Sequence, residues 1–284
     1  MSALLDLVAQ ARLRVAGFHP QRASTQFGEV NALVAQGDGP LPPLVMLHGV
    51  SSRGSHFRTL APGLLRHFRQ IVLPDFLGHG ASAPPRRWDT PALILSMGEA
   101  LDALVPDNML LYGNSMGGYA ALKIAAARPG RVRGLLVTSP AGGPMPDAVR
   151  AEVLGRFKLR DRASTLHLME RAFAQPPRGP LRPLVAAVIE AQLGRPEVRR
   201  LLDAIVPSDD LTTEELAALQ VPLRVIWGTA DRLLAEEQRE WYRQNLPTHA
   251  IFDEPPDYGH SAYLERAADL RARILRFAED AVGI

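Results

Sequence analysis

The chain has 284 residues, and 46% of them are hydrophobic, which suits one large globular domain with an insertion. It contains no cysteine, so disulfides, a cysteine nucleophile and thiolate metal sites are excluded. The formal net charge is only +2 and there is no long basic run, so the sequence gives no support for nucleic-acid binding.

Residues 1–15 are amphipathic at helical spacing and predict a short extra helix beside the domain. Asp6, Arg12 and Arg14 interrupt the apolar positions, and the segment lacks the basic start and continuous apolar run of a signal peptide. No stretch is as long as a membrane span, so we expect no stable membrane insertion. Together with the absence of cysteine, this indicates a cytoplasmic protein.

Strand-like and helix-like segments alternate between residues 24 and 138, which predicts a mostly parallel sheet covered by helices on both faces. Thr90 is a suitable N-cap because a proline follows it, so a helix is expected after this residue. The predicted strands are residues 24–30, 32–36, 44–47, 70–73, 108–112 and 132–138, and the predicted helices are residues 55–67, 91–105 and 115–128.

The alternation stops between residues 141 and 220, where amphipathic helical segments are broken by prolines and glycines. It returns at residue 221 and continues to the last helix. The predicted helices of the interrupted part are residues 147–157, 163–173, 184–193 and 196–205, and the strands 223–227 and 250–253 and the helix 261–278 follow. The pattern therefore predicts a core domain of residues 1–140 and 221–284 and a helical insertion of residues 141–220.

The sequence Gly113-Asn114-Ser115-Met116-Gly117 lies between a predicted strand and a predicted helix. In that context G-x-S-x-G is typical of a nucleophile elbow, a tight turn that strains the serine backbone and pushes its hydroxyl into an open site. The chain segments before and after the serine nearly touch, so both flanking positions must be small, and Gly113 and Gly117 meet this requirement.

Two later segments contain an aspartate and a histidine in the order expected for such a serine. Asp231 comes just after the predicted strand 223–227, and His260 precedes the last helix. Each lies at the end of a strand or in the loop that follows, where an open α/β sheet places its site. With the elbow, these residues make the chain resemble the α/β-hydrolase superfamily, from about residue 27 to the C-terminal helix.

The resemblance implies an α/β-hydrolase fold: a mostly parallel eight-stranded sheet with helices on both faces and a helical cap inserted after the sixth strand. It implies a triad in which Ser115 attacks, His260 acts as the base and Asp231 orients the imidazole. The backbone N–H groups of Met116 and of Val50, which follows His-Gly, would stabilise the oxyanion. Neither a metal nor an organic cofactor is implied.

Other polar residues near these segments have simpler interpretations. His48, Asp75 and His79 resemble residues that order the loops around the site, and Asp257 is too close in sequence to His260 to orient it easily. The histidines at positions 167 and 249 are expected on the surface or in packing contacts.

Substrate selection is expected from the cap and from the loops 51–56 and 140–145. The candidate substrate-binding residues are Ser51, Asn114 and Ala141. The segment 139–145, rich in glycine and proline, is suited to a cap hinge. The partner is then a small-molecule substrate, and the sequence gives no indication of the oligomeric state.

The resemblance favours hydrolysis of a small-molecule carboxylic ester. Serine at the elbow excludes the dehalogenases and epoxide hydrolases of this fold, which use aspartate. The elbow Gly-Asn-Ser-Met-Gly-Gly is similar to that of carbon–carbon hydrolases of aromatic degradation, although Ser261 stands where those enzymes usually have tryptophan. The resemblance is also compatible with a cofactor-free haloperoxidase or perhydrolase and with a ligand receptor without turnover.

Overall fold

The computed structural model describes residues 2–283, and the side chains of residues 7–283. Its strands form one eight-stranded sheet in the order β1-β2-β4-β3-β5-β6-β7-β8. β1 pairs with β2, and β2 with β4, in antiparallel register, and all the other pairings are parallel. The strands are β1 His19–Thr25, β2 Gly28–Gln36, β3 Leu44–Leu47, β4 Gln70–Pro74, β5 Met109–Asn114, β6 Val132–Thr138, β7 Leu223–Ile226 and β8 Ile251–Asp253. The predicted fold class is confirmed.

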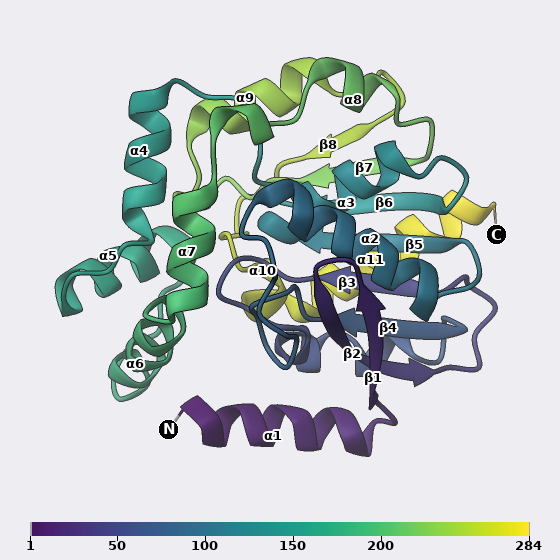
Figure 1. The fold of residues 1–284 in the computed structure, drawn as a ribbon, viewed down its shortest axis with the longest axis horizontal. Helices are drawn as coiled ribbons and strands as arrows, with labels where there is room; N and C mark the ends of the chain where they lie inside the picture. The colour runs from purple at the N-terminus through teal and green to yellow at the C-terminus, as the bar shows by residue number, and fades with distance from the viewer. Residues whose placement is uncertain (1, 284) are drawn as a thin grey trace.

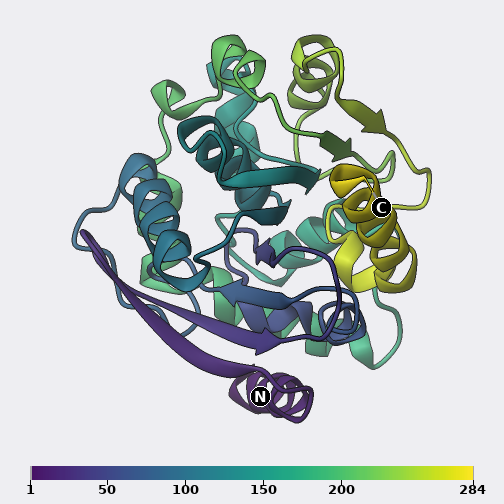
Figure 2. The same cartoon turned by 90° about the vertical axis from the view of Figure 1, so that its right-hand side faces the viewer.

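Two apolar layers cover the sheet, because successive side chains of a strand point to opposite faces. In β5, Leu111 packs with the helices α2 (Thr90–Leu104) and α3 (Met116–Ala127), whereas Leu110 and Tyr112 pack with α11 (Ala267–Val282) on the other face. Figure 2 shows α2 and α11 on opposite sides of the strands. Strands buried on both faces read as continuous apolar runs, which is why the central strands were predictable.

Five α-helices and a short 3-10 helix lie between β6 and β7, where the sequence predicts the insertion. The four longer ones gather at one end of the sheet, on the left of Figure 1, whereas the short last α-helix lies at the top, in contact with α3. Their bounds are α4 Asp147–Arg156, α5 Arg162–Ala172, α6 Leu181–Leu193, α7 Pro196–Ala204, η3 Pro207–Asp209 and α8 Thr213–Ala217. The four longer helices coincide with the four predicted ones within a few residues.

The first two strands are divided differently from the prediction. The turn lies at residues 26–27, and Asn31, where we expected the break, is paired with Arg22 inside β2. Asn31 is buried and its side chain donates to Asp75, so its polar character reflects a buried hydrogen bond rather than a turn.

Three other predictions of helix bounds are wrong. The segment 55–67 forms two short 3-10 helices, η1 (Gly54–Thr59) and η2 (Pro62–Leu64), because Pro62 and Gly63 interrupt it. The N-cap of α2 is Asp89, whose carboxylate accepts from the Ala92 N–H, and not Thr90. The last predicted helix is split into α10 (Ala262–Glu265) and α11, and α9 (Glu236–Asn245) was not predicted.

The N-terminal helix α1 spans Ser2–Val15, and Met1 of the predicted segment lies outside the described residues. α1 packs beside η1 with Leu13 fully buried and lies along the lower edge of the molecule in Figure 1. Within residues 2–283, none of the helices has the length and apolar character needed to cross a membrane.

Candidate active site

Ser115 lies at the turn between β5 and α3 in a strained conformation, with φ 57° and ψ −121°. Its backbone is held on both sides, because its N–H donates to the Thr138 carbonyl at 3.0 Å and its carbonyl accepts from the N–H groups of Tyr119 at 3.0 Å and Ala141 at 3.1 Å. A non-glycine residue keeps a positive φ only when its surroundings enforce it. The predicted elbow geometry is therefore present.

The two glycines of the elbow are required by space. A Cβ at Gly113 would lie 2.3 Å from the Gly117 carbonyl oxygen, and a Cβ at Gly117 would lie 2.1 Å from the Leu47 oxygen. Both distances are far below a normal contact, so the strand, the helix and the end of β3 pack directly on one another. The prediction that both positions must be small is confirmed.

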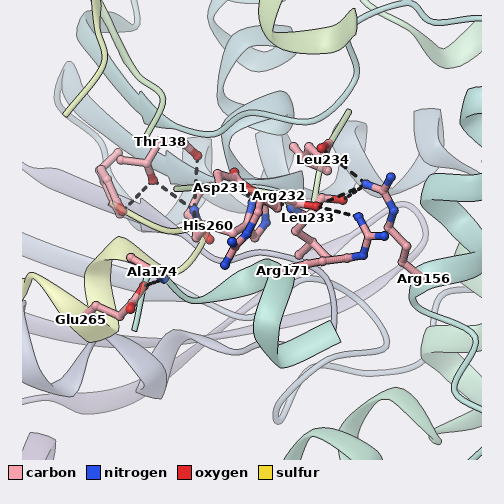
Figure 3. A network of polar contacts seen from close by, with 12 residues as sticks. Thr138, Arg156, Arg171, Ala174, Asp231, Arg232, Leu233, Leu234, His260 and Glu265 are labelled. Carbon is pink, nitrogen blue, oxygen red and sulfur yellow. Dashed lines mark hydrogen bonds and ion pairs between the residues drawn. The ribbon is translucent and has the colours of Figure 1, made fainter. Parts of the chain in front are cut away.

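Asp231 and His260 face each other in the loops after β7 and β8, with 2.8 Å between Asp231 Oδ2 and His260 Nδ1 (Figure 3). The Asp231 side chain is fully buried. Burial raises its pKa, but the facing His260 and hydrogen bonds from His260, Ser139 and the Leu233 N–H outweigh burial, so the pKa lies below its usual range. A carboxylate held in this way fixes the proton on Nδ1 and leaves Nε2 as an acceptor.

The His260 loop is joined directly to the elbow. The Asn114 side-chain amide donates to the His260 carbonyl at 2.9 Å and to the Thr138 carbonyl at 3.2 Å. Within the part of the chain that the structure describes, no hydrogen bond joins the Ser115 hydroxyl to His260, but both side chains line the same cavity.

The loop after β3 brings a second backbone N–H toward Ser115. Gly49 packs so closely that a Cβ there would lie 3.2 Å from the Ser115 Cβ. The N–H groups of Val50 and Met116 have no acceptor among residues 2–283, and both residues line a cavity with Ser115. Two such unpaired donors beside a nucleophile can stabilise an oxyanion.

The peptide between Gly49 and Val50 is fixed from its carbonyl side. The Gly49 oxygen lies 2.8 Å from His48 Nδ1 and accepts from the Ser52 N–H at 3.1 Å. His48 Nε2 accepts from the Phe76 N–H at 3.1 Å, so Nδ1 carries the proton and donates. Since the C=O and N–H of a trans peptide point in opposite directions, these bonds orient the Val50 N–H.

His79 holds the next residue of the same loop. Its Nε2 accepts from the N–H of Ser51, which has φ 58°, at 3.3 Å. Burial lowers the pKa of His48 to about 4 and that of His79 to about 3, so both imidazoles are neutral and can accept hydrogen bonds near neutral pH.

The inserted helices contact both the Asp231 and the His260 loops (Figure 3). Arg156 at the end of α4 donates to the Leu233 carbonyl at 2.6 Å. At the end of α5, the Arg171 carbonyl accepts from the Arg232 N–H at 3.0 Å, and the Ala172 carbonyl accepts from the Ser261 N–H at 3.3 Å. The insertion thus helps to position the two loops.

Two cavities meet at Ser115, and both are also lined by Val50 and Phe157. The first, which we call the Tyr119 chamber, has a volume of about 110 Å³ and lies among α2, α3, α4 and α7. The second, which we call the His260 chamber, has a volume of about 370 Å³ and contains His260 together with a row of apolar α6 side chains. These side chains are Leu184, Val185, Val188 and Ile189.

The three candidate substrate-binding residues lie in different surroundings. Ser51 lines the His260 chamber and Ala141 lines the Tyr119 chamber. Asn114 also lines the His260 chamber, but its amide is used in the hydrogen bonds to Thr138 and His260.

The other aspartate and histidines considered for the roles of Asp231 and His260 line neither chamber. Asp257 is on the surface with Arg266 at 3.0 Å, and His167 and His249 are exposed. The sequence pattern indicated only general loop roles for His48 and His79, without their contacts to the Gly49–Ser51 backbone. The one signal was their place in the loops that follow β3 and β4.

Comparison with known proteins agrees with this fold. Residues 44–273 match the model of the alpha/beta hydrolase family. A pimeloyl-[acyl-carrier protein] methyl ester esterase of Yersinia enterocolitica is 29% identical over 251 residues, which are 83% of this chain and 93% of that protein. Lipase 3 of a Moraxella species is 23% identical over 237 residues, which are 80% of this chain and 74% of the lipase.

Solved structures show the same fold. A membrane phospholipase A superposes with a TM-score of 0.84 at 23% identity, over 100% of this chain and 93% of its own. The 2-hydroxy-6-oxo-6-phenylhexa-2,4-dienoate hydrolase of a Rhodococcus species gives a TM-score of 0.77 at 23% identity, over 92% of this chain and 98% of its own.

Proposed function

The chain belongs to the alpha/beta hydrolase family, and from this premise we propose that it hydrolyses a small-molecule carboxylic ester through an acyl-enzyme formed on Ser115. The observation that carries the proposal is the strained serine at φ 57°, which shares one cavity with His260, whose Nδ1 faces Asp231. The names of the two curated relatives, an esterase and a lipase, support the same reaction class.

In the first half of the reaction, His260 Nε2 takes the proton of the Ser115 hydroxyl while the oxygen attacks the ester carbonyl. Asp231 stabilises the imidazolium without taking its proton. The negative charge that develops on the carbonyl oxygen is stabilised by the N–H groups of Val50 and Met116. The imidazolium then gives its proton to the leaving alcohol as the ester bond breaks.

In the second half, a water replaces the alcohol. His260 takes a proton from the water, which attacks the acyl-enzyme, and the proton returns to the Ser115 oxygen as the carboxylic acid leaves. Residues 141–220 would act as a cap that shapes the substrate space, because they supply most of the apolar lining of both chambers.

The test is hydrolysis of a series of nitrophenyl esters of increasing acyl length by the wild type and by Ser115→Ala. We expect the variant to lose on the order of 10⁴-fold in turnover, and an active-site fluorophosphonate to label the wild type at Ser115 alone. Ser208→Ala is the control, because Ser208 is exposed and lines neither chamber. Wild-type turnover in Ser115→Ala would refute the proposal.

A second candidate, carbon–carbon bond hydrolysis, rests on the likeness to the Rhodococcus dienoate hydrolase. The same series should therefore include a vinylogous diketone. Cleavage of the diketone in preference to every ester would favour this candidate, whereas hydrolysis of the esters alone would exclude it.

A further inference from the structure

The two chambers differ in charge. The charged side chains of the Tyr119 chamber are Arg150, Asp209 and Asp210, and Arg150 is buried and binds Asp210 through both terminal nitrogens, one at 2.9 Å. One cation against two carboxylates leaves this chamber without a cation for an anionic ligand. Among the described residues that line the His260 chamber, Arg58 is the only lysine, arginine, aspartate or glutamate.

Arg58 has no acidic partner in the part of the chain that the structure describes, since no hydrogen bond or ion pair is formed by its guanidinium. It is half-buried on η1, and its charge reaches Tyr263, whose pKa is raised by burial and lowered in part by Arg58. None of its nitrogens is a buried atom without a partner, so an anionic ligand can reach them, and a charge-assisted hydrogen bond is strong at a partly buried position. Ser52 and Ser261 line the same chamber, and the Ser52 hydroxyl is hydrogen-bonded to His56 Nδ1 at 2.8 Å.

The reaction itself decides which part of an ester occupies each chamber, and this step rests on the proposed function. His260 lines only the His260 chamber, and its proton goes to the leaving oxygen, so the alcohol portion lies there. The Tyr119 chamber, which also opens on Ser115 and whose lining is mostly apolar, then remains for the acyl portion.

We propose that Arg58 binds an anionic group, a carboxylate or a phosphate, on the alcohol portion of the substrate, and that the acyl portion is uncharged. Arginine binds both groups through parallel N–H donors. The substrate class is then an ester that joins a short apolar acid to an alcohol bearing a carboxylate or a phosphate group.

The experiment uses aryl butyrates that differ only at the ring position opposite the ester. One bears a carboxylate, one a phosphonate and one a neutral carboxamide. The quantity measured is the ratio of kcat/KM for each anionic ester to that for the carboxamide, because this ratio removes effects common to all substrates. The carboxylate and phosphonate esters show which anion is preferred.

We expect Arg58→Gln to lower this ratio about tenfold, mainly through KM, and Arg58→Lys to restore part of it. Raising the salt from about 50 to about 500 mM should lower the wild-type ratio but not that of Arg58→Gln. The matched control is Arg66→Gln, since Arg66 is exposed in the neighbouring segment and lines neither chamber, so the ratio should stay unchanged.

An equal ratio in the wild type and Arg58→Gln would overturn the assignment, and so would an equal fall in Arg66→Gln, which would indicate a general effect of net charge. In both cases Ser115-dependent hydrolysis of the carboxamide ester would leave the proposed function intact. Equilibrium binding of the same esters to Ser115→Ala, with and without Arg58→Gln, tests the anion preference even without turnover. Equal affinities there would refute it.

Discussion

His48 offers a way to separate the orientation of the Val50 N–H from the stability of the fold. Its Nδ1 donates to the Gly49 carbonyl at 2.8 Å, and its Nε2 accepts from the Phe76 N–H at 3.1 Å. Asparagine can place an amide N–H near the position of Nδ1, whereas glutamine can place a carbonyl oxygen near that of Nε2. His48→Asn therefore keeps the donor to Gly49, and His48→Gln keeps the acceptor for Phe76.

The size of each effect on kcat and on stability follows from the hydrogen bonds that remain in the variant. Deleting an oxyanion donor costs about 10²–10³ in kcat, but the Gly49 carbonyl keeps its 3.1 Å bond from the Ser52 N–H. We therefore expect His48→Gln to lose about tenfold in kcat, with KM little changed. This loss is about half, as a free energy, of the loss expected when an oxyanion donor is deleted. His48→Asn should keep most of kcat but leave the buried Phe76 N–H unpaired, which lowers the free energy of unfolding by about 1–3 kcal/mol.

Steady-state kinetics on one nitrophenyl ester and urea unfolding of both variants measure the two effects. We expect opposite orders of activity and stability, in which the less active variant, His48→Gln, is the more stable one. If His48→Gln were as active as His48→Asn, the Gly49 carbonyl bond would have no role in orienting the oxyanion donor.

Three further expectations follow from the same geometry. Asp231→Asn should lower kcat for a nitrophenyl ester by about 10⁴-fold, whereas Asp257→Asn should not, and a large loss in Asp257→Asn alone would assign the role of the acid to Asp257. Gly117→Ala should destabilise by about 3 kcal/mol or more in urea unfolding, because its Cβ meets a β3 carbonyl at 2.1 Å. Burial lowers the pKa of His48 to about 4 and that of His79 to about 3, below the 6.5 of an unfolded chain, so the unfolded state binds more protons below pH 6.5. As the pH is lowered from about 6.5 to about 4, the free energy of unfolding should fall by about 1.4 kcal/mol per pH unit for each histidine. A free energy of unfolding that does not change over this range would contradict their burial as neutral groups.

Strands with both faces buried were predictable because they need continuous apolar residues and little else. The segment 44–47 was placed without error, as was 132–138, and the elbow followed from the two glycines around Ser115. The order Ser115, Asp231, His260 predicted the location of the candidate site, because this fold places such residues at strand ends.

Long-range hydrogen bonds could not be predicted from the local pattern. Asn31 looked like a turn residue, yet it lies in β2 and bonds to Asp75, 44 residues away. The helix expected over 55–67 is absent because Pro62 and Gly63 interrupt it, and these two residues are visible in the sequence. Arg58 had no distinguishing local signal, since its position in the His260 chamber depends on tertiary packing.

The contacts of α5 limit how a cap could open. Its last residues accept hydrogen bonds from the N–H groups of Arg232 and Ser261, next to Asp231 and His260. If α5 moved outward as a lid, both loops would lose a partner at the moment when their geometry matters most. α6 is joined to α5 through Glu190, which lies 3.0 Å from Arg162. Because α6 supplies the apolar row of the His260 chamber, its displacement alone would admit an alcohol portion while α5 keeps the two loops in place.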